Sequence, residues 1–195
     1  TPNTKGFNGN ANIFNVKVTT LGQGINKLGG FLELSPDERY VFFGGVFEEG
    51  EQFDNKILAA DLTDGRLWEL PGSPIGEASA NGLLATAEMD KIYINHLADD
   101  TFDTYTDADM LFSGSFSPDG AKFVYNSTNG IRLIDIVGKA TTEISQNRYD
   151  GAYAWYADSN RILGFRENPL DNIFEAGRGR ILADWNLTAK TSTDI

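Results

Sequence analysis

The chain alternates apolar and polar residues over short stretches that end in turn residues. Residues 57–70, Ile-Leu-Ala-Ala-Asp-Leu-Thr-Asp-Gly-Arg-Leu-Trp-Glu-Leu, predict a strand, a tight turn and a second strand, because period-two alternation is typical of strands and Asp and Gly are typical of hairpin turns. Residues 131–144 and 181–195 repeat this pattern, and residues 13–28 resemble it. The sequence has no helix-period pattern of useful length. We therefore expect an all-β protein.

A second phrase recurs between these strand pairs. Residues 116–125, Phe-Ser-Pro-Asp-Gly-Ala-Lys-Phe-Val-Tyr, echo residues 34–43, Leu-Ser-Pro-Asp-Glu-Arg-Tyr-Val-Phe-Phe. A weaker copy spans residues 156–163 and a fainter one residues 86–93. A β-type repeat with a period near 40 residues is typical of propeller blades. An inner strand, this turn, a second strand and the strand pair together supply the four strands that a blade needs.

The Ser-Pro-Asp-Gly phrase at residues 117–120, followed by a basic residue and an apolar strand, resembles the TolB-type β-propeller repeat. The resemblance is strong at residues 35–43 and 117–125 and weak at residues 77–110. It implies a propeller of four-stranded blades with about four to five blades visible. TolB-like repeats occur in periplasmic scaffolds, in gating domains of prolyl-oligopeptidase-like peptidases and in surface proteins. The resemblance therefore implies an architecture and leaves the activity to be argued from the residues.

The repeat predicts a single β-propeller domain over the whole sequence. The expected units are a partial blade and four blades, at residues 1–28, 29–77, 78–112, 113–148 and 149–195. Two interpretations of this count stay open. The ring has five blades and the N-terminal strands complete a blade with the C-terminus, or the chain is a fragment of a larger ring and part of a longer chain or an assembly. An open propeller leaves strand edges exposed, which natural proteins normally avoid.

The charge balance argues against one class of partner. Lys and Arg number 16 against 28 acidic residues, which gives a net charge of −12. Such a surface repels phosphate backbones, so we expect no nucleic-acid partner. No apolar run approaches the length of a membrane helix, so no membrane insertion is expected. Thr1-Pro2-Asn3-Thr4 lacks the features of a signal peptide. We expect an exported protein whose signal has been removed, located in the periplasm, secreted or at the cell surface.

The residues for familiar catalytic sites are scarce. His96 is the single histidine and no Gly-x-Ser-x-Gly segment accompanies it, so a Ser-His-Asp triad is not expected. The chain has no cysteine, which excludes thiolate metal sites and disulfides. The expected inner strands at residues 82–87, 113–117 and 152–156 hold no Asp or Glu, and this argues against a glycosidase with paired carboxylates in the funnel. The repeated aspartates of the Ser-Pro-Asp phrase are expected to hold turns.

The most acidic stretch lies in the unit that departs from the repeat. Residues 88–109 hold seven carboxylates and one lysine, and we expect much of this stretch to be a loop inserted between blade strands. Loops carry function more often than the scaffold does, and carboxylate oxygens suit Ca²⁺. The candidate ligands are Asp99, Asp100, Asp103, Asp107 and Asp109. The favoured alternative is a solvated acidic loop without a cofactor, because the mid-loop glycine and closing glutamate of a helix-loop-helix calcium site are missing.

Aromatic side chains are the candidates for ligand binding, because a few aromatic anchors carry most of the energy of many interfaces. The candidates are Phe47, Phe53, Phe102, Tyr105, Tyr153 and Trp155. The first two are expected in a loop at residues 46–55, the next two in the acidic stretch, and the last two on an inner strand. Core or inter-blade packing is the alternative for each of them.

These patterns predict a non-enzymatic, exported propeller module. It would bind a protein, a peptide or a glycan through its blade loops. The alternative is the gating propeller of a prolyl-oligopeptidase-like or other hydrolase whose catalytic domain lies outside this sequence.

Overall fold

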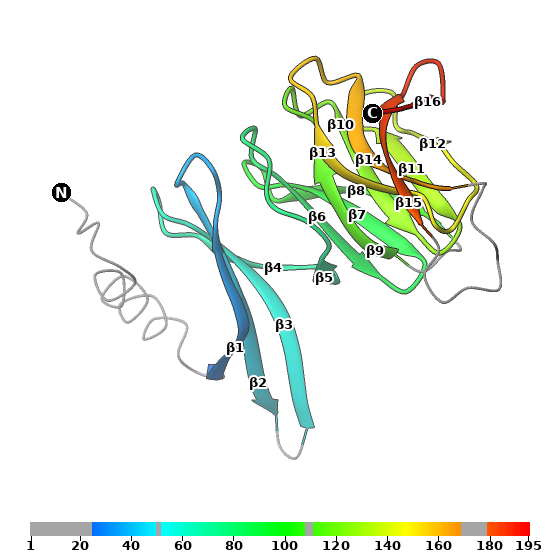
Figure 1. Ribbon diagram of the computed structural model, residues 1–195. Helices are drawn as coiled ribbons and strands as arrows, with labels where there is room; N and C mark the ends of the chain where they lie inside the picture. The colour runs from blue at the N-terminus through cyan, green and yellow to red at the C-terminus, as the bar shows by residue number, and fades with distance from the viewer. Residues whose placement is uncertain (1–24, 50–51, 108–110, 169–178) are drawn as a thin grey trace, which may run out of the picture. The chain divides into compact units, whose positions relative to one another are not determined.

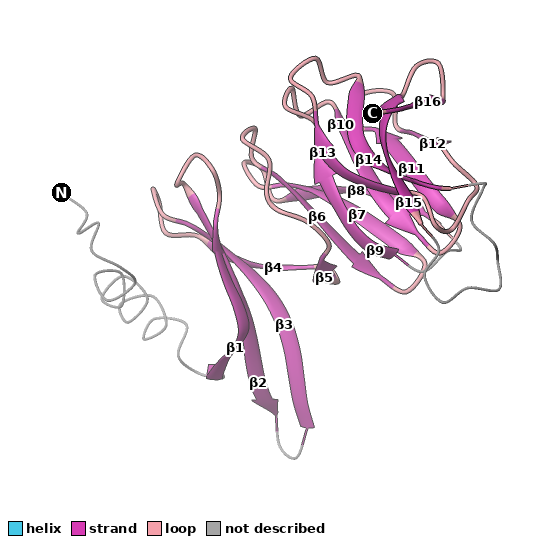
Figure 2. Cartoon of the chain, in the orientation of Figure 1, coloured by secondary structure: helices cyan, strands magenta, loops and turns pink. Residues whose placement is uncertain are grey.

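The computed structural model describes residues 25–49, 52–107, 111–168 and 179–195. Within these ranges the chain forms strands, turns and no helix. The strands make four antiparallel sheets of four strands each, and in every sheet strands that follow one another in the chain are neighbours (Figures 1 and 2). The prediction of an all-β chain built from four-stranded blades is confirmed.

The first sheet has long second and third strands. Its strands are β1 (Ile25–Leu34), β2 (Tyr40–Glu49), β3 (Gln52–Asp61) and β4 (Leu67–Leu70). The pairing of β2 with β3 runs without interruption from Tyr40 opposite Asp61 to Glu49 opposite Gln52. The prediction of a loop at residues 46–55 is therefore wrong, because strand pairing continues to residues 49 and 52.

The other three sheets follow at the expected spacing. Their strands are β5 (Ser73–Pro74), β6 (Leu83–Glu88), β7 (Lys91–His96), β8 (Thr101–Thr106), β9 (Leu111–Phe116), β10 (Lys122–Ser127), β11 (Gly130–Asp135), β12 (Ala140–Glu143), β13 (Gly151–Trp155), β14 (Arg161–Glu167), β15 (Arg180–Asn186) and β16 (Thr191–Asp194). The unit predicted at residues 78–112 belongs to a complete sheet, β5 to β8, whose short first strand precedes residue 78.

The chain divides into two compact units. Among the described residues, those from Ile25 to Leu70 apart from Ser35–Asp37 form the first unit, and Ser35–Asp37 with those from Pro71 to Ile195 form the second. The sheet β1 to β4 thus belongs to one unit and the remaining three sheets to the other. The expectation of one domain over residues 1–195 stays a prediction, and the expected partial blade at residues 1–28 lies almost wholly outside the described residues.

The second unit buries two apolar clusters, one between each pair of consecutive sheets. The first joins β6, β7 and β8 to β10 and β11, with Ile92, Ile94 and Phe123 fully buried. The second joins the opposite face of β10 and β11 to the last sheet, with Ile131 and Ile162 fully buried. Alternate residues of β10 and β11 therefore enter different clusters, as period-two side-chain alternation requires. The middle sheet is covered on both faces.

The turn between the first and second strands has the same backbone form in all four sheets. Its fourth residue has a positive φ in each: 58° at Glu38, 72° at Gly82, 69° at Gly120 and 53° at Ser159. In the second sheet this turn is Ser79-Ala80-Asn81-Gly82, where the amide of Gly82 donates to the carbonyl of Ser79. The same bond joins Gly120 to Ser117 and Ser159 to Tyr156. This bond recurs in the three sheets of the second unit, and a fourth residue that tolerates a positive φ recurs in all four sheets.

Two sequence predictions for the second sheet are therefore wrong. Residues 86–93, taken as a faint copy of the Ser-Pro-Asp-Gly phrase, form the hairpin between β6 and β7. Of residues 82–87, taken as an inner strand, residues 83–87 lie in β6, the second strand of its sheet. Both errors have one cause: Ser79–Gly82 keeps the turn without its Pro and Asp, so the phrase was not recognised there.

Successive turns of this kind are hydrogen-bonded to one another in the second unit. The side-chain amide of Asn81 donates to the carbonyl of Asp119 at 2.8 Å. The amide of Asp119 donates to the hydroxyl of Ser159 at 3.2 Å, and the ammonium of Lys122 donates to the carbonyl of Ser159 at 2.7 Å. Three consecutive sheets are thus joined at their first turns.

The first and second strands of the second unit also contact neighbouring sheets through specific polar groups. The side-chain oxygen of Asn126 accepts from the amide of Ala152 at 2.8 Å, and its nitrogen donates to the carbonyl of Ala152 at 3.0 Å. The indole of Trp155 donates to the hydroxyl and the carbonyl of Ser115 at 3.1 and 3.2 Å. The amide of Gly114 donates to the carbonyl of Ile75 at 2.6 Å. The bonds of Asn126 and Trp155 fix β13 against β9 and β10, and the bond of Gly114 joins β9 to the segment after β5.

We predict that Gly120→Ala lowers the free energy of unfolding of the second unit by about 1–3 kcal/mol. A Cβ at this position would lie 2.3 Å from the side-chain nitrogen of Asn81, and the backbone φ of 69° is unfavourable for alanine. Urea denaturation followed by tryptophan fluorescence measures this. The matched control is Met89→Gly, at another positive-φ turn position whose side chain is exposed; it should change the free energy little. Equal stability of Gly120→Ala and the unmodified chain would contradict the close contact.

Candidate binding surface

Two turns of each sheet lie at the same end of the strands, because neighbouring strands are antiparallel. These are the turns between the first and second strands and between the third and fourth strands. We call this end of the three sheets of the second unit the turn face. Its turns are residues 79–82, 97–100, 117–120, 136–139, 156–159 and 187–190. Loops at one end of a scaffold are the usual place for binding residues, so the turn face is the first surface to consider.

The repeated aspartate of the turn is occupied by local hydrogen bonds. Asp119 accepts from the hydroxyl of Ser117 at 2.6 Å and from the amide of Ala121 at 3.0 Å. These bonds, led by the one from Ser117, hold the pKa of the Asp119 carboxyl below its usual range. Asp37 accepts from the hydroxyl of Ser35 at 2.5 Å. The expectation that these aspartates hold turns rather than take part in chemistry agrees with their contacts.

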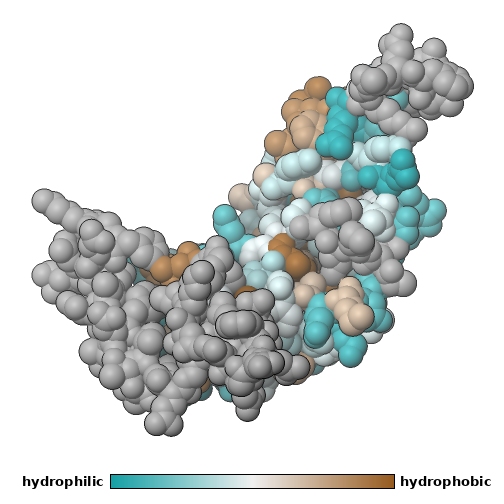
Figure 3. Space-filling view, turned by 90° about the horizontal axis from the view of Figure 1, so that it is seen from below, coloured by the Kyte–Doolittle hydropathy of each residue, from teal (hydrophilic) through white to brown (hydrophobic). Residues whose placement is uncertain are grey.

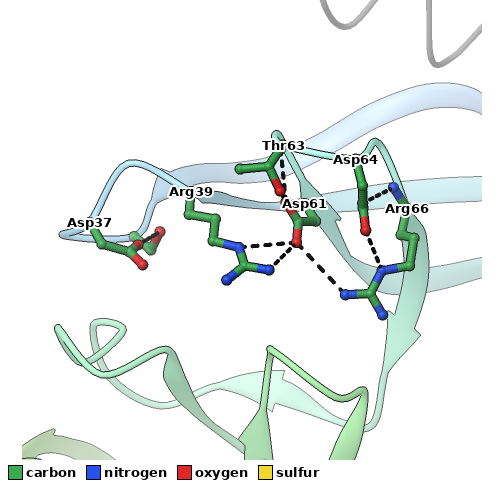
Figure 4. Close-up of polar contacts among 7 residues, drawn as sticks. Asp37, Arg39, Asp61, Thr63, Asp64 and Arg66 are labelled. Carbon is green, nitrogen blue, oxygen red and sulfur yellow. Dashed lines mark hydrogen bonds and ion pairs between the residues drawn. The ribbon is translucent and has the colours of Figure 1, made fainter.

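In the first unit a buried aspartate closes the turn between β3 and β4. The side chain of Asp61 is fully buried, and one of its oxygens receives Nε and a terminal nitrogen of Arg39 at 3.1 and 2.8 Å (Figure 4). Arg66 lies 3.7 Å from the same oxygen, and the other oxygen accepts from the amide and hydroxyl of Thr63. Burial alone would raise the pKa of Asp61, but the bonds from Arg39 and Thr63 outweigh it and lower that pKa well below its usual range.

The corresponding residues of two other sheets serve the same purpose. Asp135 accepts from the amide of Gly138 at 2.8 Å, and Asn186 accepts from the amide of Ala189 at 2.9 Å. Each stands at the end of the third strand of its sheet. An Asn serves as well as an Asp, which indicates a capping role in which the carboxylate charge is not needed.

The acidic stretch is not a long loop. Residues 101–106 form strand β8, paired along its whole length with β7, so the predicted inserted loop is wrong. Asp99 and Asp100 stand in the turn before this strand: Asp99 accepts from the hydroxyl of Thr101 at 2.7 Å, and Asp100 has a φ of 57°. The bond from Thr101 holds the pKa of the Asp99 carboxyl below its usual range.

Two further candidate ligands of this stretch, Asp103 and Asp107, have separate partners. Asp103 lies 2.5 Å from the ammonium of Lys139 and 3.2 Å from Nε2 of His96. Asp107 is buried and accepts from the hydroxyl of Tyr125 at 2.5 Å. Asp103 could become a metal ligand only by giving up two contacts to the neighbouring strand and sheet.

Within the described residues no three His, Cys, Asp or Glu side chains are grouped in a way that could hold a metal ion. Asp109, the last of the candidate ligands, lies outside those residues. Ca²⁺ binding by this stretch stays a prediction, and so does the alternative without a cofactor.

Two of the six candidate aromatic residues have packing roles. Tyr105 is buried in the cluster between the second and third sheets, and burial raises the pKa of its hydroxyl. Trp155 is partly buried, packs against the next cluster and bonds to Ser115. Core packing, the alternative given for both, is the role that the structure favours.

Two others present their rings to solvent. Phe102, on β8, is 52% exposed and meets the ring of Tyr93 edge-on at 5.4 Å between centroids. Tyr153, on β13, is 58% exposed and meets the ring of Phe165 at 4.9 Å. Tyr153 stands at an irregularity in the pairing of β13 with β14, between Ala152 and Ala154. The side chains of Phe47 and Phe53 lie outside the described part of the molecule, although their backbones pair within β2 and β3.

Exposed apolar residues also occur elsewhere on the surface. On the side of the molecule shown in Figure 3, hydrophobic residues appear in separate patches among hydrophilic ones. Isolated exposed apolar residues are normal in proteins, so exposure alone does not mark a site. Phe102 is distinguished by its place at the turn-face end of β8, next to the turn that holds Asp99.

Sequence reasoning missed two features of this unit. Asn81 joins two turns, and the only signal for it was the Ser-x-Asn-Gly spacing at residues 79–82. The contact between Asp107 and Tyr125 links the segment after β8 to β10, and no local pattern could have indicated a pair so distant in the sequence.

No protein-family model and no curated protein matches the chain. Among solved structures, the chain is similar to the β-propeller domain of the Trilobed protease from Pyrococcus furiosus, with a TM-score of 0.64 and 13% identity over 89% of this chain and 57% of that one. It is similar to the acylaminoacyl peptidase of Pyrococcus horikoshii, with a TM-score of 0.58 and 12% identity over 92% of this chain and 33% of that one.

A third similar structure is a TolB-like protein from Agrobacterium tumefaciens, with a TM-score of 0.53 and 14% identity over 87% of this chain and 65% of that one. The fold is that of a β-propeller. Identities this low carry no further conclusion about activity. The chain spans less than two thirds of the length of each of these three proteins. The described residues also contain no helix with the length and apolar character that a membrane span requires.

We predict that Asp61→Asn lowers the free energy of unfolding of the first unit at pH 7 by about 1–3 kcal/mol, because it weakens the contact with Arg39 while the site stays buried. The pKa of Asp61 is lower in the folded than in the unfolded chain, so its stabilisation is present above about pH 4 and is lost as the pH falls further. The difference between the two proteins should therefore narrow in acid.

Urea denaturation at a series of pH values between 2 and 7 measures that difference. The matched control is Asp64→Asn, which removes an exposed carboxylate from the same turn and should have a small effect. A pH-independent difference between the unmodified chain and Asp61→Asn would contradict the role given to this charge.

Proposed function

We propose that this chain is a non-catalytic propeller module of the TolB-like type that binds a protein, a peptide or a glycan. The exposed ring of Phe102 at the turn-face end of β8 is the observation on which the proposal rests. An aromatic ring that is half exposed and held edge-on by a buried neighbour presents a rigid apolar surface at low entropic cost, as binding anchors do.

The surroundings of Phe102 bear on the kind of ligand. The turn before β8 carries the exposed carboxylates of Asp99 and Asp100, and the whole chain has a net charge of −12. A ring beside carboxylates suits a sugar, which offers an apolar face and hydroxyl donors, or a peptide with basic side chains. The same charge disfavours nucleic acid. We propose a periplasmic, secreted or cell-surface location for the module.

The contacts of the titratable groups also favour binding over catalysis. Asp61, Asp103 and Asp119 are each engaged by neighbouring donors. Their pKa values are lowered, whereas a carboxyl acting as a general acid needs a raised pKa. Within the described residues, His96 contacts Asp103 and no serine hydroxyl bonds to its ring.

A second candidate is the gating propeller of a hydrolase. It is favoured by the similarity to the propeller domain of a protease and to an acylaminoacyl peptidase, of which this chain covers a third. In that case the catalytic segment would come from other parts of the natural polypeptide. The sequence of that polypeptide, together with cleavage assays on chromogenic acyl-aminoacyl substrates, separates the two candidates.

We predict that Phe102→Ala abolishes or strongly weakens binding to whichever peptide or glycan the unmodified chain retains on peptide and glycan arrays, by a factor of about 10 or more. Its midpoint of thermal unfolding should fall by only a few degrees, because the side chain is half exposed. Surface plasmon resonance with the retained compound and thermal denaturation are the two measurements.

The matched control is Met89→Ala, which removes another exposed apolar side chain from the opposite end of the same sheet. Binding should survive this change. Unaltered affinity in Phe102→Ala would refute the assignment of the ring. Loss of folding in Phe102→Ala would show instead that the ring belongs to the core.

A further inference from the structure

Each sheet of the second unit has one face that points toward the following sheet. In β5 to β8 this face presents Ala85, Ile92 and Ile94, which are fully buried against β10 and β11. In β9 to β12 it presents Val124 and Ile131, which are buried against the last sheet. In both cases a four-stranded sheet covers the face.

The last sheet has the same face, and apolar side chains lie on it. Pairing within the sheets places Leu182 of β15 at the position of Ile92 and Ile131. The two isoleucines are 0% exposed, whereas Leu182 is 38% exposed. Leu163 of β14 corresponds to Val124 in the same way and is only half-buried.

Two aromatic side chains also lie on this face of the last sheet. Phe165 stands opposite Leu182 and packs edge-on against the exposed Tyr153. We call the surface formed by Tyr153, Leu163, Phe165 and Leu182 the open face. It lies on the side of the sheet opposite to Ile162, Ala183 and Trp185, which belong to the buried cluster.

A polar group on the open face also lacks a partner. Asp184 stands opposite Leu163, at the position that Ile94 and Leu133 occupy in the preceding sheets. Its Oδ2 accepts from Arg161 at 3.0 Å, whereas its Oδ1 is buried with no hydrogen-bond partner among the described residues. A buried carboxylate oxygen without a donor is costly, so a covering partner should place a donor against Asp184.

We propose that the open face is the docking surface for a further four-stranded blade supplied by the same polypeptide, with an apolar face toward Leu182 and a hydrogen-bond donor toward Asp184. The two contacts between sheets in this unit join the face of one sheet to the opposite face of the next. A further blade continues that arrangement. A second copy meeting open face to open face would instead pair two identical surfaces of chains that each carry a net charge of −12.

The extent of the similar structures supports this source. The structural match with the Pyrococcus furiosus propeller domain covers 89% of this chain but 57% of that domain. The match with the TolB-like protein covers 65% of that protein. Those proteins therefore have substantial chain that no part of the present one matches. Radial repetition of blades is how propellers leave only short, protected edges. The proposal concerns a surface separate from Phe102 and does not depend on ligand binding there.

The test uses thiol labelling, since the 195-residue chain has no cysteine. Leu182→Cys is introduced into this chain and into the full natural polypeptide, and the rate of maleimide labelling at that position is followed by peptide mass spectrometry. The controls are Val137→Cys at an exposed turn and Ile131→Cys at the equivalent buried position. In the 195-residue chain, Leu182→Cys should label nearly as fast as Val137→Cys.

In the natural polypeptide, Leu182→Cys should label slower than Val137→Cys by a factor of roughly ten or more, as Ile131→Cys does, because labelling then requires local opening. Equally fast labelling in both proteins would overturn the proposal. So would protection in the 195-residue chain that rises with its concentration, since that result identifies a second copy as the occupant. Ligand binding measured on Phe102→Ala is unaffected by either result, so the two proposals fail separately.

Discussion

A four-stranded sheet with apolar residues on both faces is not stable alone, and this constraint organises the second unit. Side chains alternate along every strand, so β10 and β11 send Phe123 and Ile134 to one cluster and Val124 and Ile131 to the other. The middle sheet is stable because a neighbour covers each face. Burial of large apolar side chains on both faces contributes about 1.5–3 kcal/mol for each one. The order of the sheets follows from this need for cover.

Many of the polar side chains hold the turns that connect the strands. The clusters between the sheets are apolar, and several carboxylates lie at the turns, where they hold the backbone. Asp61, Asp119 and Asp158 each accept bonds from amides or side chains within their own turn or strand pair. A chain with 28 acidic residues therefore uses several of its carboxylates as turn caps. Its acidity is partly a product of the repeat and only partly a surface available to a partner.

The architecture could be predicted because its signals are local. Period-two alternation, turn residues and a repeat near 40 residues each act over a few positions, and they gave the four-stranded blades. The second sheet was misread because its first strand has two residues and its turn, at residues 79–82, keeps only the Ser and Gly of the phrase. The prediction relied on the residue types Ser, Pro, Asp and Gly, whereas the turn requires only a residue that tolerates a positive φ at its fourth position.

The binding residues were harder to predict, because exposure is a property of the assembled sheets. Tyr105 and Phe102 lie three residues apart on one strand, yet one enters the core and the other meets solvent. Strand alternation separates them, and it became visible only once β8 was known to be a strand. Tyr153 and Trp155 are two residues apart and would share a face in a regular strand, but the irregularity in the pairing of β13 lies at Tyr153. Acidic composition had suggested a loop where the ladder of β7 and β8 continues.

The amide of Asn126 has a consequence for how the sheets are aligned. Its two polar atoms bond both the N–H and the C=O of Ala152, as a neighbouring strand would. The two bonds can form together only when β13 has one particular position along its strand axis relative to β10. Sliding that strand by one residue would turn the matching pair of backbone groups away and break both of these bonds. Apolar packing tolerates small displacements between sheets. This single amide therefore determines the position of β13, and with it the last sheet, along the strand direction relative to β10.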